Sequence, residues 1–217
     1  KQIFSRAWQV IGHESEIREP GDFILRDTAG RRIIFLRDRH GAARAYLNTC
    51  THRGNAVCRA EEGNTKAFMC TYHGWSFDLA GNLIGVPDID LFYKGDLDKS
   101  KYGLVEVAQM ANYHGFVFCT MDETAPPLEE YLGPMGRLGI DLIAARDVEI
   151  IPGIQKFISD CNWKFAVDNL FDWYHVGISH ASALMTSMAR RQPGQGVSPT
   201  ASLTVPQMVM LGDYGHA

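Results

Sequence analysis

Cysteine and histidine occur as two closely spaced pairs in this chain, in Cys50-Thr51-His52-Arg53-Gly54 and in Cys70-Thr71-Tyr72-His73-Gly74-Trp75. The spacing is C-x-H in the first stretch and C-x-x-H in the second. Two thiolates and two imidazoles delivered as separate pairs suit a two-iron, two-sulfur cluster, with sulfur ligands on one iron and nitrogen ligands on the other. The pattern therefore predicts that a metal cluster is bound by Cys50, His52, Cys70 and His73.

Structural zinc is an alternative occupant, because zinc also accepts two thiolates and two imidazoles. Zinc motifs more often pair Cys with Cys and His with His, whereas each pair here is mixed, so the cluster is favoured. A disulfide between Cys50 and Cys70 is a weaker alternative, because the chain has five cysteines, an odd number, and shows no signal peptide. These features favour a reducing cytoplasm. The other cysteines lack a partner at ligand spacing and are interpreted as structural: Cys58, Cys119 and Cys161.

The composition is that of a soluble globular protein, with 46% hydrophobic and 21% charged residues. A net charge of -4 and a pI near 6.1 offer no electrostatic footprint for nucleic acid. Apolar runs are too short to span a bilayer. We therefore expect neither a nucleic acid nor a membrane as a partner.

The first 120 residues are typical of short strands separated by turns. Strands are expected at residues 32–36, 43–48, 66–69, 75–79, 104–110 and 115–120. The two Cys/His pairs then lie on loops at the tips of neighbouring hairpins. A sheet would hold these loops rigidly while the imidazoles face outward toward an electron partner, and Trp75 would shield the cluster from water.

A boundary follows at Asp122-Glu123-Thr124-Ala125-Pro126-Pro127, where acidic residues and two prolines end the strand-rich region. A helix is expected from Leu128 to Leu142, and a strand from Val148 to Ile158 with Pro152-Gly153 interrupting it. The remaining sequence is interpreted as a different domain.

The second domain carries another candidate metal site, on a predicted helix that begins near Trp163. Asp168, Asp172 and His175 are spaced to share a polar stripe, opposite an apolar face of Trp163, Val167, Leu170, Phe171 and Tyr174. Gly177 favours a loosening of the helix that returns His180 toward His175. Two imidazoles and a carboxylate form the facial triad of non-haem Fe(II) oxygenases. Alone, His-x4-His is a weak signal, but it gains weight downstream of a predicted electron-transfer cluster.

These two motifs, in this order, resemble the large catalytic (alpha) subunit of bacterial Rieske non-haem iron aromatic-ring-hydroxylating dioxygenases. The resemblance covers roughly the first 185 residues. It includes residues 4–13, Pro20-Gly21-Asp22, both Cys/His pairs, Gly81-Asn82, Asn162-Trp163-Lys164 and the segment from Asp168 to His180.

The resemblance implies an α+β chain with a mainly-β N-terminal Rieske [2Fe-2S] domain and the start of a truncated α+β catalytic domain of the helix-grip type. Three segments are expected: residues 1–30 as a lead-in that packs with the catalytic domain, 31–122 as the Rieske domain, and 123–217 as the first part of the mononuclear-iron domain.

The same resemblance implies roles for the site residues. Cys50, His52, Cys70 and His73 are the cluster ligands, and His175 and His180 are two ligands of the catalytic iron. Asp172 matches the family's bridging aspartate, which would contact its own His175 and the His73 of a neighbouring subunit. Asn169, Val176 and Leu184 are expected to form walls of the substrate pocket.

The third iron ligand is where the sequence departs from the family pattern. The family supplies a carboxylate from a helix far downstream of the two histidines, and Asp213 is the only acidic residue after His180. Asp213 is too near to fit that arrangement and is not assigned. We therefore expect these residues to be the front part of a longer subunit.

The implied activity is oxygenation fed by electrons. NAD(P)H would supply electrons through a partner reductase, ferredoxin or both to the Rieske cluster, and then to a mononuclear Fe(II) that activates O₂ beside a small aromatic substrate. Dioxygenase relatives form cis-dihydrodiols. Neighbouring alpha subunits, in a trimer, and a small beta subunit are the implied partners. The alternatives are a Rieske electron carrier without its own catalysis and a structural zinc protein. The sequence leaves open the substrate, and whether the reaction is dioxygenation, monooxygenation or demethylation.

Overall fold

The computed structural model describes residues 3–151, 153, 157–172, 175–182 and 212–215. It divides into two compact units, Lys1–Pro152 with Leu211–Ala217, and Gly153–Met210.

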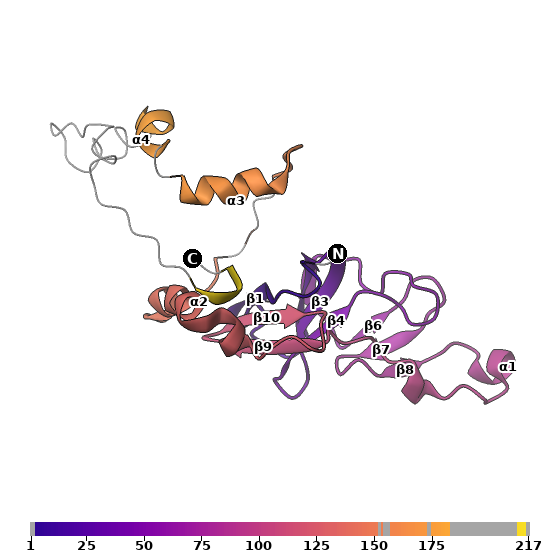
Figure 1. Cartoon of the computed structure of the whole chain (residues 1–217). Helices are drawn as coiled ribbons and strands as arrows, with labels where there is room; N and C mark the ends of the chain where they lie inside the picture. The colour runs from indigo at the N-terminus through magenta and orange to yellow at the C-terminus, as the bar shows by residue number, and fades with distance from the viewer. Residues whose placement is uncertain (1–2, 152, 154–156, 173–174, 183–211, 216–217) are drawn as a thin grey trace. The chain divides into compact units, whose positions relative to one another are not determined.

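The first unit consists mainly of antiparallel strands arranged in three sheets (Figure 1). One sheet has the order β1-β10-β9, with β1 at Gln9–His13, β9 at Gln109–Tyr113 and β10 at Phe116–Thr120. The second has the order β4-β3-β2-β5, with β2 at Asp22–Thr28, β3 at Arg31–Arg37, β4 at Ala43–Leu47 and β5 at Glu62–Asn64. The third has the order β6-β7-β8, at Ala67–Met69, Ser76–Asp78 and Leu83–Gly85.

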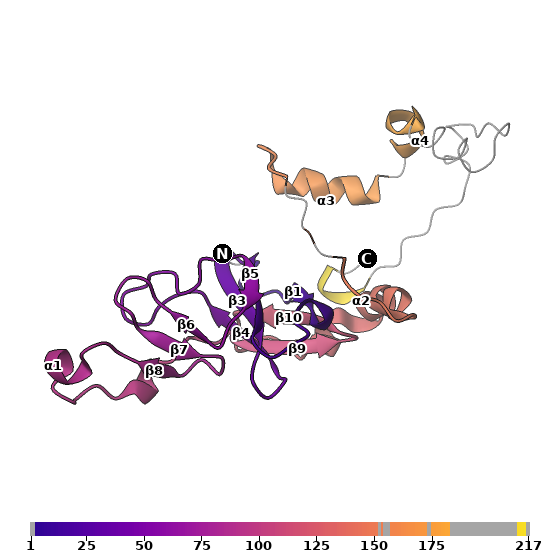
Figure 2. The ribbon, with the colours of Figure 1, turned by 180° about the vertical axis from the view of Figure 1, so that it is seen from behind.

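Helical segments connect or flank these sheets. The short α1 spans Ile89–Tyr93 and the longer α2 spans Leu128–Ala144. Single 3-10 turns occur at Glu14–Glu16, Lys99–Lys101 and Asp213–Gly215. Figure 2 shows α1 beyond the β6-β7-β8 sheet, at the opposite end of the first unit from α2.

Strand β3 lies between two hydrophobic cores of the first unit and contributes side chains to both. Its sequence is apolar without alternation, as expected for a strand that is buried on both faces. Ile34 and Leu36 point into the core that holds Cys50, Cys70 and Trp75. Ile33 and Phe35 point the other way, into a core shared with β1 and β10. The four-stranded sheet therefore has the core around the two Cys/His loops on one face and a second hydrophobic core on the other face.

Helix α2 packs on the β1-β10-β9 sheet. Leu128 and Leu132 form a third core with Trp8 and Phe118, and the Trp8 indole N–H donates to the carbonyl of Pro126 at 2.8 Å. The backbone of Gly133 is not helical, so α2 bends immediately before Pro134. The helix expected from Leu128 to Leu142 is confirmed, with this kink added.

Five of the expected strands are confirmed as β3, β4, β6, β7 and β10, with ends that differ by no more than one residue. The strand expected at residues 104–110 is wrong in most of its length. Only Gln109 and Met110 belong to β9, while Glu106 makes an isolated bridge to Tyr46 in β4. The strand expected at residues 148–158 is also wrong, because no strand is found in the described part of that stretch.

The N-terminal lead-in differs from the expectation as well. Strand β2 pairs with β3 along its whole length, from Phe23 opposite Leu36 to Thr28 opposite Arg31. The expected boundary after residue 30 therefore falls inside a β-hairpin, and β2 contributes Phe23 and Leu25 to the core around the Cys/His loops.

The second unit contains helix α3 at Trp163–Phe171 and helix α4 at Val176–Ser179. Helix α3 starts where the sequence predicts, with the Asn162 side chain accepting a hydrogen bond from the Lys164 N–H at 3.1 Å. It ends before Asp172, whose backbone is not helical. The continuous polar stripe expected through Asp168, Asp172 and His175 is therefore wrong. Gly177 lies inside α4, which ends at Ser179, so the helix is interrupted before His180 as expected but not at the glycine itself.

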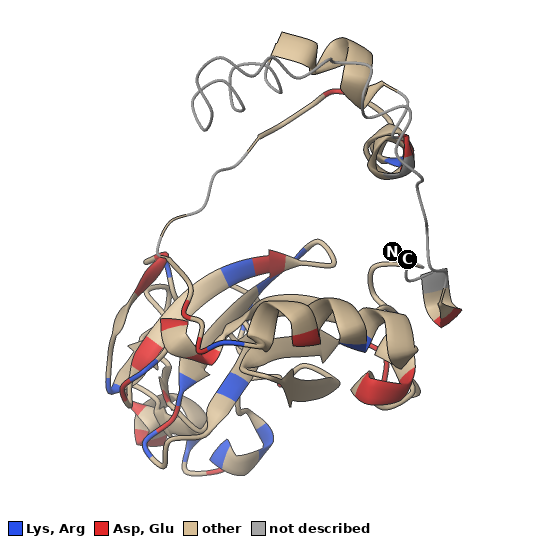
Figure 3. Cartoon of the chain, turned by 90° about the vertical axis from the view of Figure 1, so that its left-hand side faces the viewer, with Lys and Arg blue, Asp and Glu red and all other residues tan. Residues whose placement is uncertain are grey.

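Basic and acidic residues are interspersed along the ribbon of the first unit (Figure 3). Among the described residues, no helix has the length and apolar character needed to cross a membrane.

Candidate functional site

The two Cys/His loops share one backbone pattern. In the first, the Cys50 N–H donates to the Asn55 carbonyl at 2.8 Å and the Gly54 N–H donates to the Cys50 carbonyl at 2.8 Å. In the second, the Cys70 N–H donates to the Trp75 carbonyl at 2.8 Å and the Gly74 N–H donates to the Cys70 carbonyl at 2.9 Å. Each loop is therefore a closed turn that begins at its cysteine and presents its histidine within the turn.

A glycine completes each turn in the left-handed region of φ, at 77° for Gly54 and 72° for Gly74. Gly74 has a second constraint, because a Cβ atom there would lie 2.8 Å from Cγ of Pro87. The first loop has open space at the same position. The second loop is therefore packed closely against the chain that follows β8.

The structure brings the four predicted cluster ligands together as two pairs, thiol with thiol and imidazole with imidazole. Cys50 and Cys70 are buried, at 3% and 2% exposure, and their side chains interact directly. The rings of His52 and His73 lie with centroids 4.7 Å apart. His52 is half-buried and His73 is exposed. The sulfur atoms thus lie on the core side and the imidazoles toward the surface, as expected for a cluster that exchanges electrons through its histidine edge.

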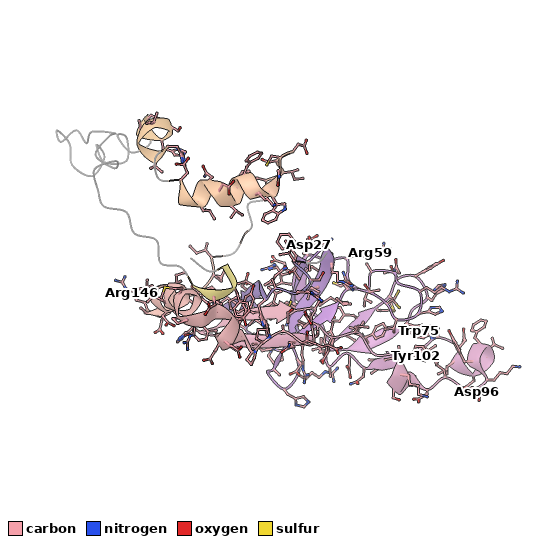
Figure 4. All side chains as sticks on the ribbon, in the orientation of Figure 1. Asp27, Arg59, Trp75, Asp96, Tyr102 and Arg146 are labelled. Carbon is pink, nitrogen blue, oxygen red and sulfur yellow. The ribbon has the colours of Figure 1, made fainter. Side chains whose placement is uncertain are left out.

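Aromatic rings surround this group of side chains. Trp75 is buried at 3% exposure and stacks on His52, with ring centroids 4.7 Å apart and planes at 9°. Tyr102 meets Trp75 edge-on at 5.6 Å, and the two lie beside each other in Figure 4. The Thr51 hydroxyl donates to the Tyr102 carbonyl at 2.7 Å. The loops are therefore contacted by the segment around Tyr102 as well as by the core of the sheet.

Burial and nearby groups set the protonation of the candidate ligands. Burial, with the adjacent charge of His73, lowers the pKa of His52 and favours its neutral form. Burial raises the pKa of Cys50. Burial also acts to raise the pKa of Cys70, but hydrogen bonds from the Tyr72 backbone and the Asn55 side chain outweigh it, so that this pKa is lowered.

The ring nitrogen Nδ1 of His52 fits a metal ligand. It is buried and has no hydrogen-bond partner within the described structure, although a buried polar atom normally has one. A neutral imidazole with an unsatisfied nitrogen beside two thiols is the donor set that a Rieske cluster takes. The residues present therefore fit this group.

The alternative of a disulfide is not supported, because all five cysteines are free. Cys58 and Cys119 are buried, in keeping with a structural role, whereas Cys161 is exposed.

The second candidate site lies in the second unit, after α3. The rings of His175 and His180 have centroids 5.2 Å apart. An Asp172 carboxylate oxygen lies 3.3 Å from Nδ1 of His175, without the alignment of a hydrogen bond at that nitrogen. The other carboxylate oxygen accepts the His175 backbone N–H at 3.4 Å. The three predicted residues are therefore neighbours, although they do not share a helix.

A complete ligand set for a single ion is not found in the part of the chain that the structure describes. Among the expected pocket residues, Asn169 is exposed on α3 and Val176 is half-buried at the start of α4. Leu184 lies outside the described residues.

Asn55 was not predicted as a site residue, yet its amide Nδ2 lies 3.6 Å from Sγ of Cys70. Its position directly after Gly54, matching Trp75 directly after Gly74, was the available signal. Tyr102 was also missed, because nothing in the local sequence connects it to a loop fifty residues earlier.

Comparison with known protein families agrees with this arrangement. The model of the Rieske [2Fe-2S] domain matches residues 7–99. The model described as ring hydroxylating alpha subunit (catalytic domain) matches residues 140–213.

Individual relatives point the same way. The biphenyl 2,3-dioxygenase subunit alpha of Rhodococcus jostii (strain RHA1) is 39% identical over 87% of this chain and 41% of its own length. The N,N-dimethyl phenylurea N-demethylase subunit alpha of Sphingobium sp. (strain YBL2) is 38% identical over 83% of this chain and 40% of its own length.

A solved structure of naphthalene 1,2-dioxygenase with indole bound in the active site superimposes with a TM-score of 0.82 at 35% identity, covering 95% of this chain and 46% of that one. The chain thus spans less than half the length of these proteins. The sequence match extends across both units, and the first unit has the fold and paired ligand loops of a Rieske domain. The chain therefore belongs to the family of ring hydroxylating alpha subunits, with a mainly-β Rieske domain followed by part of a catalytic domain.

Proposed function

We propose that this chain belongs to a terminal oxygenase component, which takes electrons through a Rieske cluster to a mononuclear Fe(II) and uses O₂ to hydroxylate an aromatic substrate. The observation that carries the proposal is the pairing of two buried thiols with two imidazoles at the surface, the rings of which are 4.7 Å apart. An electron carrier has no need of the second pair, His175 and His180, which favours the oxygenase over that alternative.

When bound, the cluster supplies one-electron transfer and the mononuclear iron supplies oxygen activation. Cys50 and Cys70 would hold one iron of the cluster from the core side. His52 and His73 would hold the other, and Trp75 packs on the His52 ring. His73 is the exposed one of the two imidazoles, so it would be the ligand nearest to a redox partner.

Asp172 positions the second site. Its carboxylate lies against both the ring and the backbone N–H of His175. A carboxylate beside one ring nitrogen favours one orientation of the imidazole, and the other nitrogen, Nε2, would then be the metal-binding atom. His180 supplies the second imidazole. In an assembly of several copies, the same Asp172 contacts His73 of a neighbouring copy and joins the two centres.

The partners follow from this scheme. A reductase or ferredoxin delivers electrons that originate from NAD(P)H, and neighbouring alpha subunits, in a trimer, complete the electron path. A small beta subunit is a further member of the assembly. Asn169, Val176 and Leu184 contribute to the pocket for the aromatic ring.

The reaction catalysed is cis-dihydroxylation of the ring. The name of the R. jostii relative, biphenyl 2,3-dioxygenase, supports this choice. Oxidative N-demethylation is the second candidate, because the Sphingobium relative is an N-demethylase of nearly equal identity.

Product analysis under ¹⁸O₂ tests the proposal. The full-length protein, reconstituted with a reductase and ferredoxin, is given biphenyl, naphthalene or an N,N-dimethyl phenylurea. Two labelled oxygen atoms in one ring product indicate dioxygenation, and formaldehyde release from the phenylurea indicates demethylation. The absence of product from all three substrates, in a protein that holds both iron centres, would contradict the oxygenase proposal.

A variant distinguishes the roles of the two sites. His175→Ala should abolish the product and leave the visible spectrum of the cluster unchanged. The reason is that His175 belongs to a different unit from the Cys/His loops and lies far from them in the sequence. His40→Ala is the matched control, since His40 lies in the exposed turn between β3 and β4. Loss of the cluster spectrum in His175→Ala alone would count against two separate metal sites.

A further inference from the structure

The residue that follows the glycine in each Cys/His loop contacts a predicted ligand in the other loop. Asn55, after Gly54, directs its side chain to Cys70 of the second loop, with Nδ2 3.6 Å from Sγ. Trp75, after Gly74, stacks on His52 of the first loop. Each loop therefore contacts a ligand of the other through the same position, but with different chemistry. Trp75 offers an apolar face, and Asn55 offers a hydrogen-bond donor.

We propose that Asn55 is a positioning residue that sets the reduction potential of the Rieske cluster, by donating a side-chain hydrogen bond to the Cys70 sulfur. The proposal rests on the proposed function in one respect, that the four predicted ligands bind the cluster. It goes beyond that function by naming a side chain that is not a ligand but sets the reduction potential of the cluster.

The orientation of the Asn55 amide follows from its other bonds. Nδ2 also donates to the carbonyl of Ala56 at 3.1 Å. An amide nitrogen has two N–H groups, so the bond to Ala56 directs one of them and leaves the other for the sulfur. The reversed amide would place a carbonyl oxygen, which is an acceptor, against both the Ala56 carbonyl and the thiolate. Both contacts therefore require the nitrogen on this side.

The backbone of Asn55 fixes where the side chain starts. Its carbonyl accepts the Cys50 N–H at 2.8 Å and closes the first loop. This bond does not involve the side chain, so a substitution at Asn55 keeps the donor and acceptor that close the loop. The effect of the amide on Cys70 is thus separable from the formation of the loop.

A hydrogen bond to a ligand sulfur favours the reduced cluster. Reduction adds one electron, and the extra negative charge is shared with the thiolate sulfurs. The N–H dipole therefore interacts more strongly with Cys70 after reduction than before it, and hydrogen bonds to the sulfurs are among the factors that set cluster potentials. Removing the donor should lower the potential.

The test is a redox titration of the full-length protein, followed by the EPR signal of the reduced cluster. Asn55→Leu keeps the size and branching of the side chain and removes the donor. At a fixed solution potential, we expect the reduced-to-oxidised ratio to fall about tenfold, which is a shift of roughly 59 mV for one electron. Asn55→Gln, which keeps an amide, should fall between Asn55→Leu and the wild type.

Thr51→Val is the matched control. It lies in the same loop and loses a side-chain hydrogen bond of 2.7 Å, but that bond goes to the backbone of Tyr102 and not to a sulfur. Its potential should equal that of the wild type. An unchanged potential in Asn55→Leu, or an equal shift in Asn55→Leu and Thr51→Val, would overturn the proposal.

Two further outcomes are assigned in advance. If Asn55→Leu fails to bind the cluster, Asn55→Ala is titrated in its place, and loss of the cluster from both variants would overturn the tuning role and mark Asn55 as necessary for assembly only. If the wild type has no Rieske EPR signal, the proposed function fails together with this inference. A normal wild-type signal with no shift in the variants overturns this inference alone.

Discussion

The indole of Trp75 lies flat on the imidazole of His52, with ring centroids 4.7 Å apart and planes at 9°. Trp75 itself is fixed from other directions by the rings of Tyr93, at 6.3 Å, and Tyr102, at 5.6 Å. The ring of His52 is therefore held by packing and not by a hydrogen bond at its buried Nδ1. A nitrogen kept without a partner in this way is preorganised for a metal.

Replacement of Trp75 tests this role of packing. Trp75→Ala leaves a cavity beside His52 and should lower the free energy of unfolding by about 3–5 kcal/mol, the range for a buried Trp→Ala change. Trp75→Phe keeps a flat ring and should lose less. The measurements are denaturant unfolding and the iron content of the purified protein. A cluster content in Trp75→Ala equal to that of the wild type would contradict the idea that Trp75 holds His52.

The two loop glycines provide a matched pair. Both have a positive φ, so that alanine at either position costs about 1–2 kcal/mol from the left-handed backbone. At Gly74 the new Cβ would also lie 2.8 Å from Cγ of the rigid Pro87 ring, which adds about 1–3 kcal/mol of overpacking. Gly74→Ala should therefore be clearly less stable than Gly54→Ala in denaturant unfolding. Equal losses would mean that the second loop moves away from Pro87 at little cost.

Asp38 is predicted to stabilise the hairpin of β3 and β4. One carboxylate oxygen accepts the N–H groups of His40 and Ala42, at 2.8 and 2.9 Å, and the other accepts Nε of Arg44 at 3.0 Å. Its side chain is 1% exposed. Asp38→Ala leaves these donors unsatisfied and should lower the free energy of unfolding by about 3 kcal/mol.

A matched control is available at the β7–β8 turn. Asp78 accepts the N–H groups of Ala80 and Asn82 in the same way, at 2.9 and 2.8 Å, but is only half-buried. Water can replace its bonds, so that Asp78→Ala should lose about 1 kcal/mol. A larger loss at Asp78 than at Asp38 would contradict the argument from burial.

The stability contributed by Asp38 should depend on pH. Burial acts to raise the pKa of this carboxyl, but the hydrogen bonds from Ala42, Arg44 and His40 outweigh it and lower the pKa in the folded protein. A depressed folded pKa gives stability that is complete above the unfolded value, about 3.9 for Asp, and is lost as the pH falls through the folded value. The difference in free energy of unfolding between the wild type and Asp38→Asn should thus be constant near neutral pH and shrink below about pH 4. A difference in free energy of unfolding that grows on acidification would contradict a lowered pKa of Asp38 in the folded protein.

Asp172 is predicted to carry electrons between centres and not to bind a metal. Asp172→Asn should keep both metals and slow the oxidation of the reduced cluster in a single turnover by roughly tenfold or more, as for other carboxylates that orient a ligand imidazole. Asp168→Asn, an exposed change on α3, is the control and should leave this rate unaltered. Unchanged cluster oxidation in Asp172→Asn would remove the bridging role.

The strands flanking the ligand loops were predictable because their signals are local. The continuous apolar run of β3 identifies a strand buried on both faces, and the Cys/His spacings identify the loops that the sheet supports. The strand prediction at residues 104–110 failed because Leu104 and Val107 are both buried but belong to different cores. The chain turns between those cores, which a period-two pattern does not reveal.

The end of α3 was not predictable from periodicity. Apolar spacing continues past Phe171, and no glycine or proline stops the helix there, yet Asp172 leaves helical geometry. The expected turn residue, Gly177, is instead buried inside α4. The contact of Asn55 with Cys70 was equally hidden, because it joins two loops whose relative placement depends on the whole sheet.

Iron and acid-labile sulfide analysis, together with the EPR spectrum of the reduced protein, tests whether the four Cys/His side chains bind a Rieske cluster. We expect two sulfides per chain, two irons in the cluster and a further mononuclear iron, with a Rieske EPR signal that requires Cys50, His52, Cys70 and His73. A colourless protein that contains zinc and no sulfide would contradict it.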